Sequence, residues 1–225
     1  MTEEDFILPK EVPVMTLRGV VLFPKAMLPL RIFEERYKEM LSSRLLNNRM
    51  FAIACEREDV SPEEEQLELP FDIATVGLIR VSKENTDGTS FVLLQGLERV
   101  RIVSIKQEVP YRIIEVEKVT TIANDDSKKI RSKITKELNR NKSLGGDVTD
   151  EMLDFLCPLD DDSTFVDLTA YTLCRTTFRK QQMLEEINFS LRANMLIDDL
   201  TQENDRLKLI SDALGGKDDK DLDFN

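Results

Sequence analysis

The chain has 225 residues, and 41% of them are hydrophobic, which is enough to bury the core of one large domain or two small ones. Its 31 lysines and arginines are outnumbered by 43 aspartates and glutamates, so the formal net charge is −12. Binders of nucleic acids and of anionic membranes obtain most of their affinity by neutralising phosphates. The negative charge therefore argues against both classes.

The sequence lacks the features of a membrane-spanning or secreted protein, which indicates its cellular compartment. It has no apolar run of about 18 residues that could span a bilayer, and residues 1–11 are acidic and polar, unlike a signal peptide. We expect a cytoplasmic protein with a flexible N-terminus over 1–11. Cys55, Cys157 and Cys174 are an odd number without close spacing, so we expect buried thiols and no disulfide framework.

The first structured stretch, 12–30, contains three short apolar runs, at 12–17, 20–23 and 27–30. Gly19 and Pro24 separate them, and both residue types favour bends. We predict three strands joined by corners. Residues 32–48 then change to helical spacing, which predicts an amphipathic helix carrying Phe33 and Tyr37.

Strands return after this helix. The apolar run 50–55 predicts a buried strand, and the highly charged stretch 56–70 predicts a surface loop. Segments 73–81 and 90–95 flank Asp87-Gly88, a pair typical of a hairpin turn, while Gly96 predicts a bulge or corner before the alternating strand 97–105. With a last strand at 111–119, about six or seven strands and one helix form a partly closed barrel.

The period becomes helical after residue 123. The spacing predicts five helices, at 125–142, 149–155, 160–174, 176–185 and 191–214. The tail 215–225 is too charged to pack and is expected to be disordered. The predicted fold is therefore α+β, with a barrel subdomain over 12–123 and a helical bundle subdomain over 124–214.

Several of these segments carry a further signal when they are taken together. They are 13–30, 76–77 with the turn 87–89, 95–102, and 165–170 followed by helices as far as Leu207. In this order they resemble a known family, the LON substrate-binding domain at the N-terminus of Lon proteases. The resemblance implies a PUA-like β-barrel followed by a helical subdomain. It also implies that the partners are non-native or tagged polypeptides, with a protease or chaperone as a further partner.

The resemblance does not extend to the ATPase and peptidase modules of Lon proteases. Gly216-Lys217 is the nearest approach to a phosphate-binding loop, but Asp218 follows it where such a loop needs Ser or Thr. We therefore expect a stand-alone LON-domain protein that does not hydrolyse ATP.

Catalytic and metal chemistry have little support in the sequence. The chain has no histidine and no Cys-x-x-Cys pair, and its acidic clusters at 63–65 and 160–162 lie in predicted surface loops. Burial cannot raise a carboxyl pKa at such positions. We expect a non-enzyme with no catalytic residues, no cofactor and no metal.

Candidate peptide-binding residues lie in the strand corner and at the start of the following helix. They are Arg18, Phe23, Met27, Glu34, Glu35, Arg36 and Tyr37. Each has a plainer interpretation as well. The apolar residues fit a core, the residues at the helix start fit a solvated helix end, and Arg18, like Arg99, fits a structural ion pair.

A second function is suggested by one basic helix in this acidic chain. Its lysines Lys128, Lys129, Lys133 and Lys136 could contact RNA phosphates, since PUA-like barrels can bind RNA. The helix has no aromatic residue to stack on bases, so a solvated helix face is favoured and nucleic acid is not the expected partner. Docking of this helix on an acidic protein is a third alternative.

Overall fold

The computed structural model describes residues 7–58, 68–122 and 127–215. Its contacts divide the chain into two compact units. The first comprises Met1–Thr121 with Thr176–Ile187, and the second comprises Ile122–Arg175 with Asn188–Asn225.

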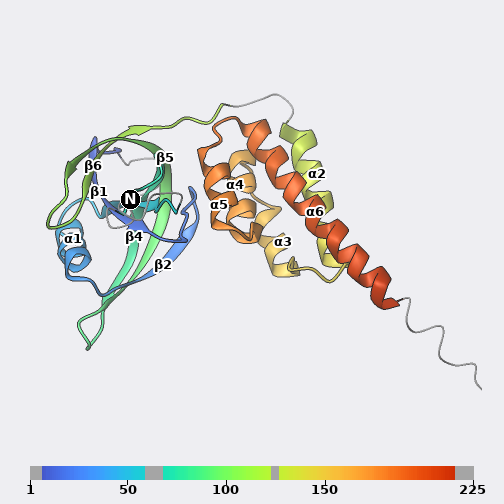
Figure 1. Ribbon diagram of the computed structural model, residues 1–225, viewed down its shortest axis with the longest axis horizontal. Coiled ribbons are helices and arrows are strands. Elements are labelled where there is room, and N and C mark those ends of the chain that lie inside the picture. Colours follow the sequence, from blue (N-terminus) through green and yellow to red (C-terminus); the bar gives the residue numbers. More distant parts are fainter. Residues whose placement is uncertain (1–6, 59–67, 123–126, 216–225) are drawn as a thin grey trace, which may run out of the picture. The chain divides into compact units, whose positions relative to one another are not determined.

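The first unit is built on a six-stranded mixed sheet, visible at the blue and green end of Figure 1. Its strands are β1 (Glu11–Leu17), β2 (Met27–Ile32), β3 (Met50–Cys55), β4 (Ile73–Glu84), β5 (Ser90–Gln107) and β6 (Ile113–Lys118). The order is β2-β5-β4-β3-β1-β6, and a further β5–β6 pairing curls the sheet back on itself. The predicted α+β class and partly closed barrel are confirmed, although β2 remains outside the closed circuit.

The inside of the curled sheet holds the first core. β1 runs parallel to β3, and all other strand pairs are antiparallel. Small and β-branched residues fill the interior, including Val14, Ala52, Val76, Val100 and Ile114. β3 is buried along its whole length, which explains why its sequence is continuously apolar instead of alternating. Helix α1 (Glu35–Leu45) buries Tyr37, Met40 and Leu41.

One predicted strand is wrong. Residues 20–23 do not join the sheet, although Val21, Leu22 and Phe23 are all buried. The Thr75 hydroxyl donates a hydrogen bond to the Leu22 carbonyl over 2.6 Å, which replaces a strand partner. An apolar run of four residues therefore indicated burial correctly. A run this short does not show whether the segment pairs with a neighbouring strand.

The predicted bulge at Gly96 is confirmed. The β4–β5 register shifts between Val76 and Gly77, where Gly77 pairs with Gly96. A Cβ atom on Gly96 would lie 2.1 Å from the Phe23 carbonyl oxygen, so the backbone of the preceding corner occupies the space of a side chain. β5 nevertheless continues past the bulge as one strand, whereas the sequence predicted two.

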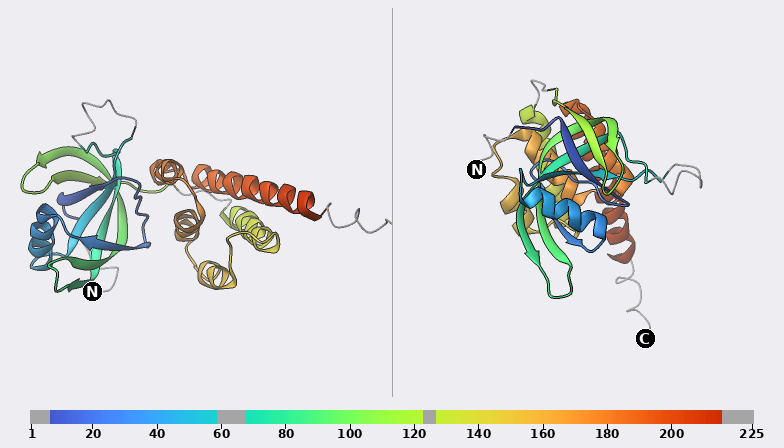
Figure 2. Two further views of the ribbon diagram at one scale, coloured as in Figure 1. Left: turned by 60° about the horizontal axis from the view of Figure 1, so that its bottom comes forward. Right: turned by 90° about the vertical axis from the view of Figure 1, so that its left-hand side faces the viewer.

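The predicted hairpin is also confirmed. β4 and β5 meet at Asn85–Thr89, and Gly88 there has a φ of +75°. Asp87 accepts a hydrogen bond from the Thr89 backbone N–H, which closes the turn. The hairpin projects from the body of the sheet in Figure 1 and in the right-hand view of Figure 2.

Five helices follow the strands. They are α2 (Ser127–Ser143), α3 (Asp150–Leu156), α4 (Asp162–Leu173), α5 (Thr177–Glu185) and α6 (Phe189–Gly215). Thr149, Asp161 and Thr176 cap α3, α4 and α5, each accepting a hydrogen bond from a first-turn backbone N–H. The sequence predicted all five with small errors at their ends.

Helices α2 and α6 lie side by side in the second unit (Figure 1). Ile134, Leu138 and Leu196 are buried there. Asn141 Nδ2 donates to Asn204 Oδ1 over 2.9 Å in the same interior, so a buried polar pair is satisfied between the two helices.

Helix α5 belongs to the first unit rather than to the second. Gln181 of α5 donates to the Ile73 carbonyl of β4 over 3.0 Å, and buried Arg99 of β5 donates through Nε to the Leu184 carbonyl over 3.1 Å. The sequence placed α5 in one helical bundle with its neighbours, because helical period does not reveal the packing partner of a helix.

The cysteines differ from expectation at one position. Cys55 and Cys174 are buried free thiols, as predicted, but Cys157, the C-cap residue of short helix α3, is exposed. The remaining predictions for residues 1–6, for 59–67 of the acidic loop, for Asp125 and Asp126 and for the tail 216–225 lie outside the described residues.

Candidate functional site

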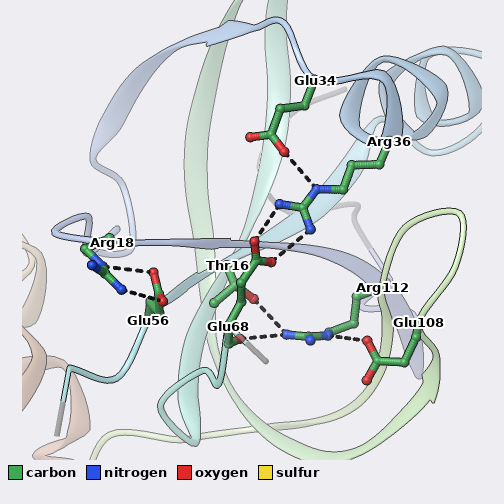
Figure 3. Close-up of polar contacts among 8 residues, drawn as sticks. All are labelled: Thr16, Arg18, Glu34, Arg36, Glu56, Glu68, Glu108 and Arg112. Carbon is green, nitrogen blue, oxygen red and sulfur yellow. Dashed lines mark hydrogen bonds and ion pairs between the residues drawn. The ribbon is translucent and has the colours of Figure 1, made fainter. Parts of the chain in front are cut away.

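A network of charged side chains lies along β1 and the start of α1, drawn in Figure 3. Arg36, in the first turn of α1, donates through Nη1 and Nη2 to both carboxylate oxygens of Glu68, at 2.9 and 2.8 Å. Its Nε donates to Glu34 over 2.9 Å. The guanidinium also lies 4.6 Å from the ring centroid of buried Tyr37. Three of the predicted site residues, Glu34, Arg36 and Tyr37, therefore meet here.

Arg112 holds the other side of Glu68. Its Nη1 donates to the Glu68 carbonyl over 2.9 Å and to the Thr16 hydroxyl over 3.2 Å, and its Nε donates to Glu108 over 2.9 Å (Figure 3). Glu68 has a φ of +46°, a region that non-glycine residues rarely occupy. Two arginines thus fix both the side chain and the carbonyl of a strained residue.

The electrostatics of this network favour the ionised forms of Arg36 and Glu68. Hydrogen bonding from Arg36 is the largest cause that lowers the pKa of Glu68, and the bond to Glu68 raises the pKa of Arg36. Burial raises the pKa of Tyr37 to about 12, so this phenol stays protonated at neutral pH. The space between these side chains is about 30 Å³, roughly that of one water molecule. The network accordingly suits a structural clamp better than a ligand site.

Arg18 also forms a pair, as the sequence favoured. Its Nη2 lies 3.0 Å from Glu56 Oε1, and its Nε donates to Oε2 over 3.3 Å (Figure 3). Arg18 is mostly exposed while Glu56 is nearly buried, so the contact covers an acid at the end of β3.

An apolar surface lies elsewhere in the first unit, on one face of β2, β5 and β4. The register places Pro29, Leu93 and Val81 in one cross-strand row, with Phe91 in the next. Phe91 is 42% exposed and Val81 46%. Met27, at 39%, begins the same face of β2. We call these five residues the outer sheet face.

Cations border the outer sheet face. The Phe91 row continues to Arg31 of β2 and Lys83 of β4, its two cross-strand partners. Arg31 Nη2 donates to Asp87 in the hairpin turn over 2.9 Å. Exposed apolar area bordered by polar groups is typical of an interaction site.

The structure separates the predicted candidates. Phe23 has no exposed surface, so it is a core residue, and only Met27 of the apolar candidates reaches the outer sheet face. Glu35 is exposed and pairs with Lys38 over 2.8 Å on the same helix. Phe33, predicted on the helix, precedes α1 and is exposed. The roles of all the candidate residues in binding stay predictions.

Sequence reasoning missed Val81, Phe91 and Leu93. The signal was the run 91–94, FVLL, which continues as apolar through both faces of a strand whose neighbours alternate. A strand with apolar residues on both faces has either two covered faces or one exposed apolar face. Tertiary structure decides between these alternatives, and a local sequence pattern does not report it.

The basic helix α2 is partly neutralised. Arg131 pairs with Asp162 over 2.8 Å, and Arg140 with Asp205 over 2.6 Å. Lys142 pairs with Asp150. The four lysines of the RNA alternative, Lys128, Lys129, Lys133 and Lys136, are exposed. Contact with RNA stays a prediction.

Within residues 7–58, 68–122 and 127–215, no group of three or more His, Cys, Asp or Glu side chains is placed to hold a metal ion. No helix in the same ranges is long and apolar enough to cross a membrane.

Comparison with known proteins identifies the family. The protein-family model of the ATP-dependent protease La (LON) substrate-binding domain matches residues 11–202 of this chain. The chain therefore belongs to the LON substrate-binding domain family, as its sequence segments indicated.

Curated relatives are Lon proteases of bacteria. Those of Trichlorobacter lovleyi and Vibrio parahaemolyticus are 24% and 26% identical over 89% and 88% of this chain. Lon protease 2 of Herpetosiphon aurantiacus is 28% identical over 88% of it. The aligned part is only 25%, 25% and 24% of these relatives, so the chain spans about a quarter of their length.

Solved structures agree on the fold. The N-terminal domain of Mycobacterium avium complex Lon protease aligns with a TM-score of 0.66 and 21% identity, covering 85% of this chain and 98% of that one. A Lon N-terminal domain protein from Xanthomonas campestris aligns with a TM-score of 0.61 and 17% identity, covering 84% and 97%.

Proposed function

We propose that this protein is a non-catalytic module that binds non-native polypeptides through the outer sheet face. The observation that carries the proposal is the cross-strand row Pro29, Leu93 and Val81, together with the exposed ring of Phe91 beside it. Membership of a substrate-binding domain family supports the same function.

The physical argument rests on what an unfolded chain offers. It exposes apolar side chains, and backbone groups that are hydrogen-bonded only to water, whereas native proteins bury most of both. An apolar face on three adjacent strands can cover such side chains without demanding one sequence. Arg31 and Lys83 would favour a segment with an acidic residue beside its apolar ones. A protease or chaperone that receives the bound chain is part of this proposal.

The test is binding of a permanently unfolded protein, such as reduced and carboxymethylated α-lactalbumin, measured by fluorescence anisotropy. The double variant Val81→Ser with Phe91→Ser should weaken binding by about tenfold or more, because it removes the most exposed apolar side chains of β4 and β5 on this face. Phe155→Ser is the matched control, since Phe155 is also exposed but lies on α3 in the other unit. Equal affinity of the double variant and the control would refute the role of this face.

A further inference from the structure

A second apolar feature of the first unit is a pocket of about 260 Å³, between the end of β3 and the start of α5. Two aromatic rings form part of its wall, and a thiol and two carboxylates lie beside them. The lining residues are Cys55, Glu56, Glu58, Phe71, Thr177 and Phe178.

Hydrogen bonds hold the walls of this pocket. The Phe71 backbone N–H donates to the Cys55 carbonyl over 2.9 Å, which ties the approach to β4 to the end of β3. The Thr177 hydroxyl donates to the Gly19 carbonyl over 3.2 Å, which ties α5 to the corner after β1. Burial raises the pKa of the Cys55 thiol to about 11, so the thiol is neutral at physiological pH. The pocket is therefore formed before any ligand binds.

Its size selects the kind of occupant. Pockets for drug-sized molecules have volumes of about 300–1,000 Å³, whereas a water molecule occupies about 30 Å³. A pocket of about 260 Å³ suits one large side chain. The rings of Phe71 and Phe178 favour an aromatic one, because aromatic pairs gain energy from stacked or edge-to-face packing.

The carboxylates select what lies beside that side chain. Ionised carboxylates only accept hydrogen bonds, so they require donors on the ligand. Glu56 is already paired with Arg18. Within the part of the chain that the structure describes, no lysine or arginine forms an ion pair with Glu58. The chain as a whole carries a formal net charge of −12. Glu58 can therefore pair with a cation of the ligand.

We propose that this pocket is a side-chain subsite that binds an aromatic residue of a polypeptide next to a lysine or arginine. The ring fills the space between Phe71 and Phe178, and the neighbouring cation pairs with Glu58. The proposal rests on the proposed function, since the ligand is a segment of the same non-native chain. It adds a sequence preference that the outer sheet face does not supply.

The experiment uses short disordered peptides of Gly and Ser with a central Trp-Lys, Trp-Glu or Ala-Lys pair, labelled for fluorescence anisotropy and tested on the full chain. Phe178→Ala removes one wall, and Phe178 is 64% exposed, so the fold does not depend on its ring. Phe155→Ala, at 60% exposure in the other unit, is the control. Glu58→Gln removes the charge and keeps the shape.

We expect the Trp-Lys peptide to bind best and Phe178→Ala to weaken it about tenfold, with no change in Phe155→Ala. Glu58→Gln should reduce the preference for Trp-Lys over Trp-Glu by about threefold, the size expected for an exposed ion pair. Equal binding of Trp-Lys and Ala-Lys, or of the wild type and Phe178→Ala, overturns the subsite. If the unfolded protein still binds and depends on Val81 and Phe91, the proposed function survives that result. If neither probe binds, both fail.

Discussion

Arg192 of α6 and Asp167 of α4 form an ion pair that is almost completely buried, with Arg192 Nε 2.9 Å from Asp167 Oδ1 and side-chain exposures of 0% and 3%. Arg192 also donates through Nη2 to Ser163 Oγ over 2.9 Å. The guanidinium therefore joins α6 to both the start and the middle of α4, inside the second unit.

Removal of one partner should be costly. Asp167→Ala leaves a buried guanidinium without its carboxylate, and we expect the free energy of unfolding to fall by about 3–5 kcal/mol. Urea unfolding followed by far-UV circular dichroism measures the change. Arg175→Ala is the comparison, because Arg175 and its partner Asp147 are both more than half exposed, and its second partner, the less exposed Glu203, keeps its pair with Arg206. The loss should therefore be about 0–1 kcal/mol. Similar losses for both variants would contradict the buried role.

The Arg36 and Glu68 pair should make stability depend on pH. The pKa of Glu68 is lowered in the folded protein, chiefly by hydrogen bonding from Arg36, so folding favours the carboxylate. The contribution is complete above the unfolded pKa of about 4.3, and it is lost as pH falls through the folded value.

Glu68→Gln tests this linkage. At neutral pH the substitution should cost about 1 kcal/mol, since partial exposure of both side chains screens the pair. The cost should shrink towards zero as the wild-type carboxylate becomes protonated, because both proteins are then neutral at this position. Thermal unfolding across acidic and neutral buffers follows the difference, and a cost that is the same throughout would rule out the linkage.

Gly96→Ala should destabilise the first unit by about 3 kcal/mol, because the added methyl group would meet the Phe23 carbonyl oxygen at 2.1 Å. Gly88→Ala is the matched substitution in the same strand pair. Nothing lies near its Cβ position, so only its φ of +75° opposes alanine, at a cost of about 1 kcal/mol. Urea unfolding of both variants measures the two costs, and the reverse ranking would show that the corner backbone does not press on Gly96.

The three thiols should differ in reactivity. Cys157 is exposed, while Cys55 and Cys174 are buried, and the pKa of Cys55 is raised to about 11. Because the thiolate is the reactive form, we expect Ellman's reagent to modify one thiol rapidly in the native protein and the other two only on unfolding. Cys157→Ser should abolish the rapid phase. A rapid phase that persists in this variant would place another thiol at the surface.

Local signals predicted most of the fold. Period change marked α1 and the later helices, Asp87-Gly88 marked the hairpin, and Gly96 marked the bulge. Each of these depends on residues close in sequence. Placement of α5 in the first unit depends instead on hydrogen bonds from Gln181 and Arg99 to residues about a hundred positions away in the sequence. The local spacing of apolar residues contains no information about such distant contacts.

The candidate site was predicted less well for a related reason. Burial of Phe23 and exposure of Phe91 are both compatible with an apolar sequence. Phe23 lies in a corner outside the sheet, and Phe91 lies on a strand, so only the tertiary structure distinguishes their exposure. The pairing of Arg36 with Glu68 spans 32 positions. Charged residues at a helix start could be identified, but their partners could not.

Hydrogen exchange of the full chain, with and without bound unfolded α-lactalbumin, tests the central proposal most directly because it locates the contact. We predict slower exchange at backbone amides of β2 and of residues 90–95 in β5, where the polypeptide would cover the outer sheet face. Binding that leaves these amides unchanged and protects α2 instead would contradict the proposal and assign binding to the lysine-bearing helix.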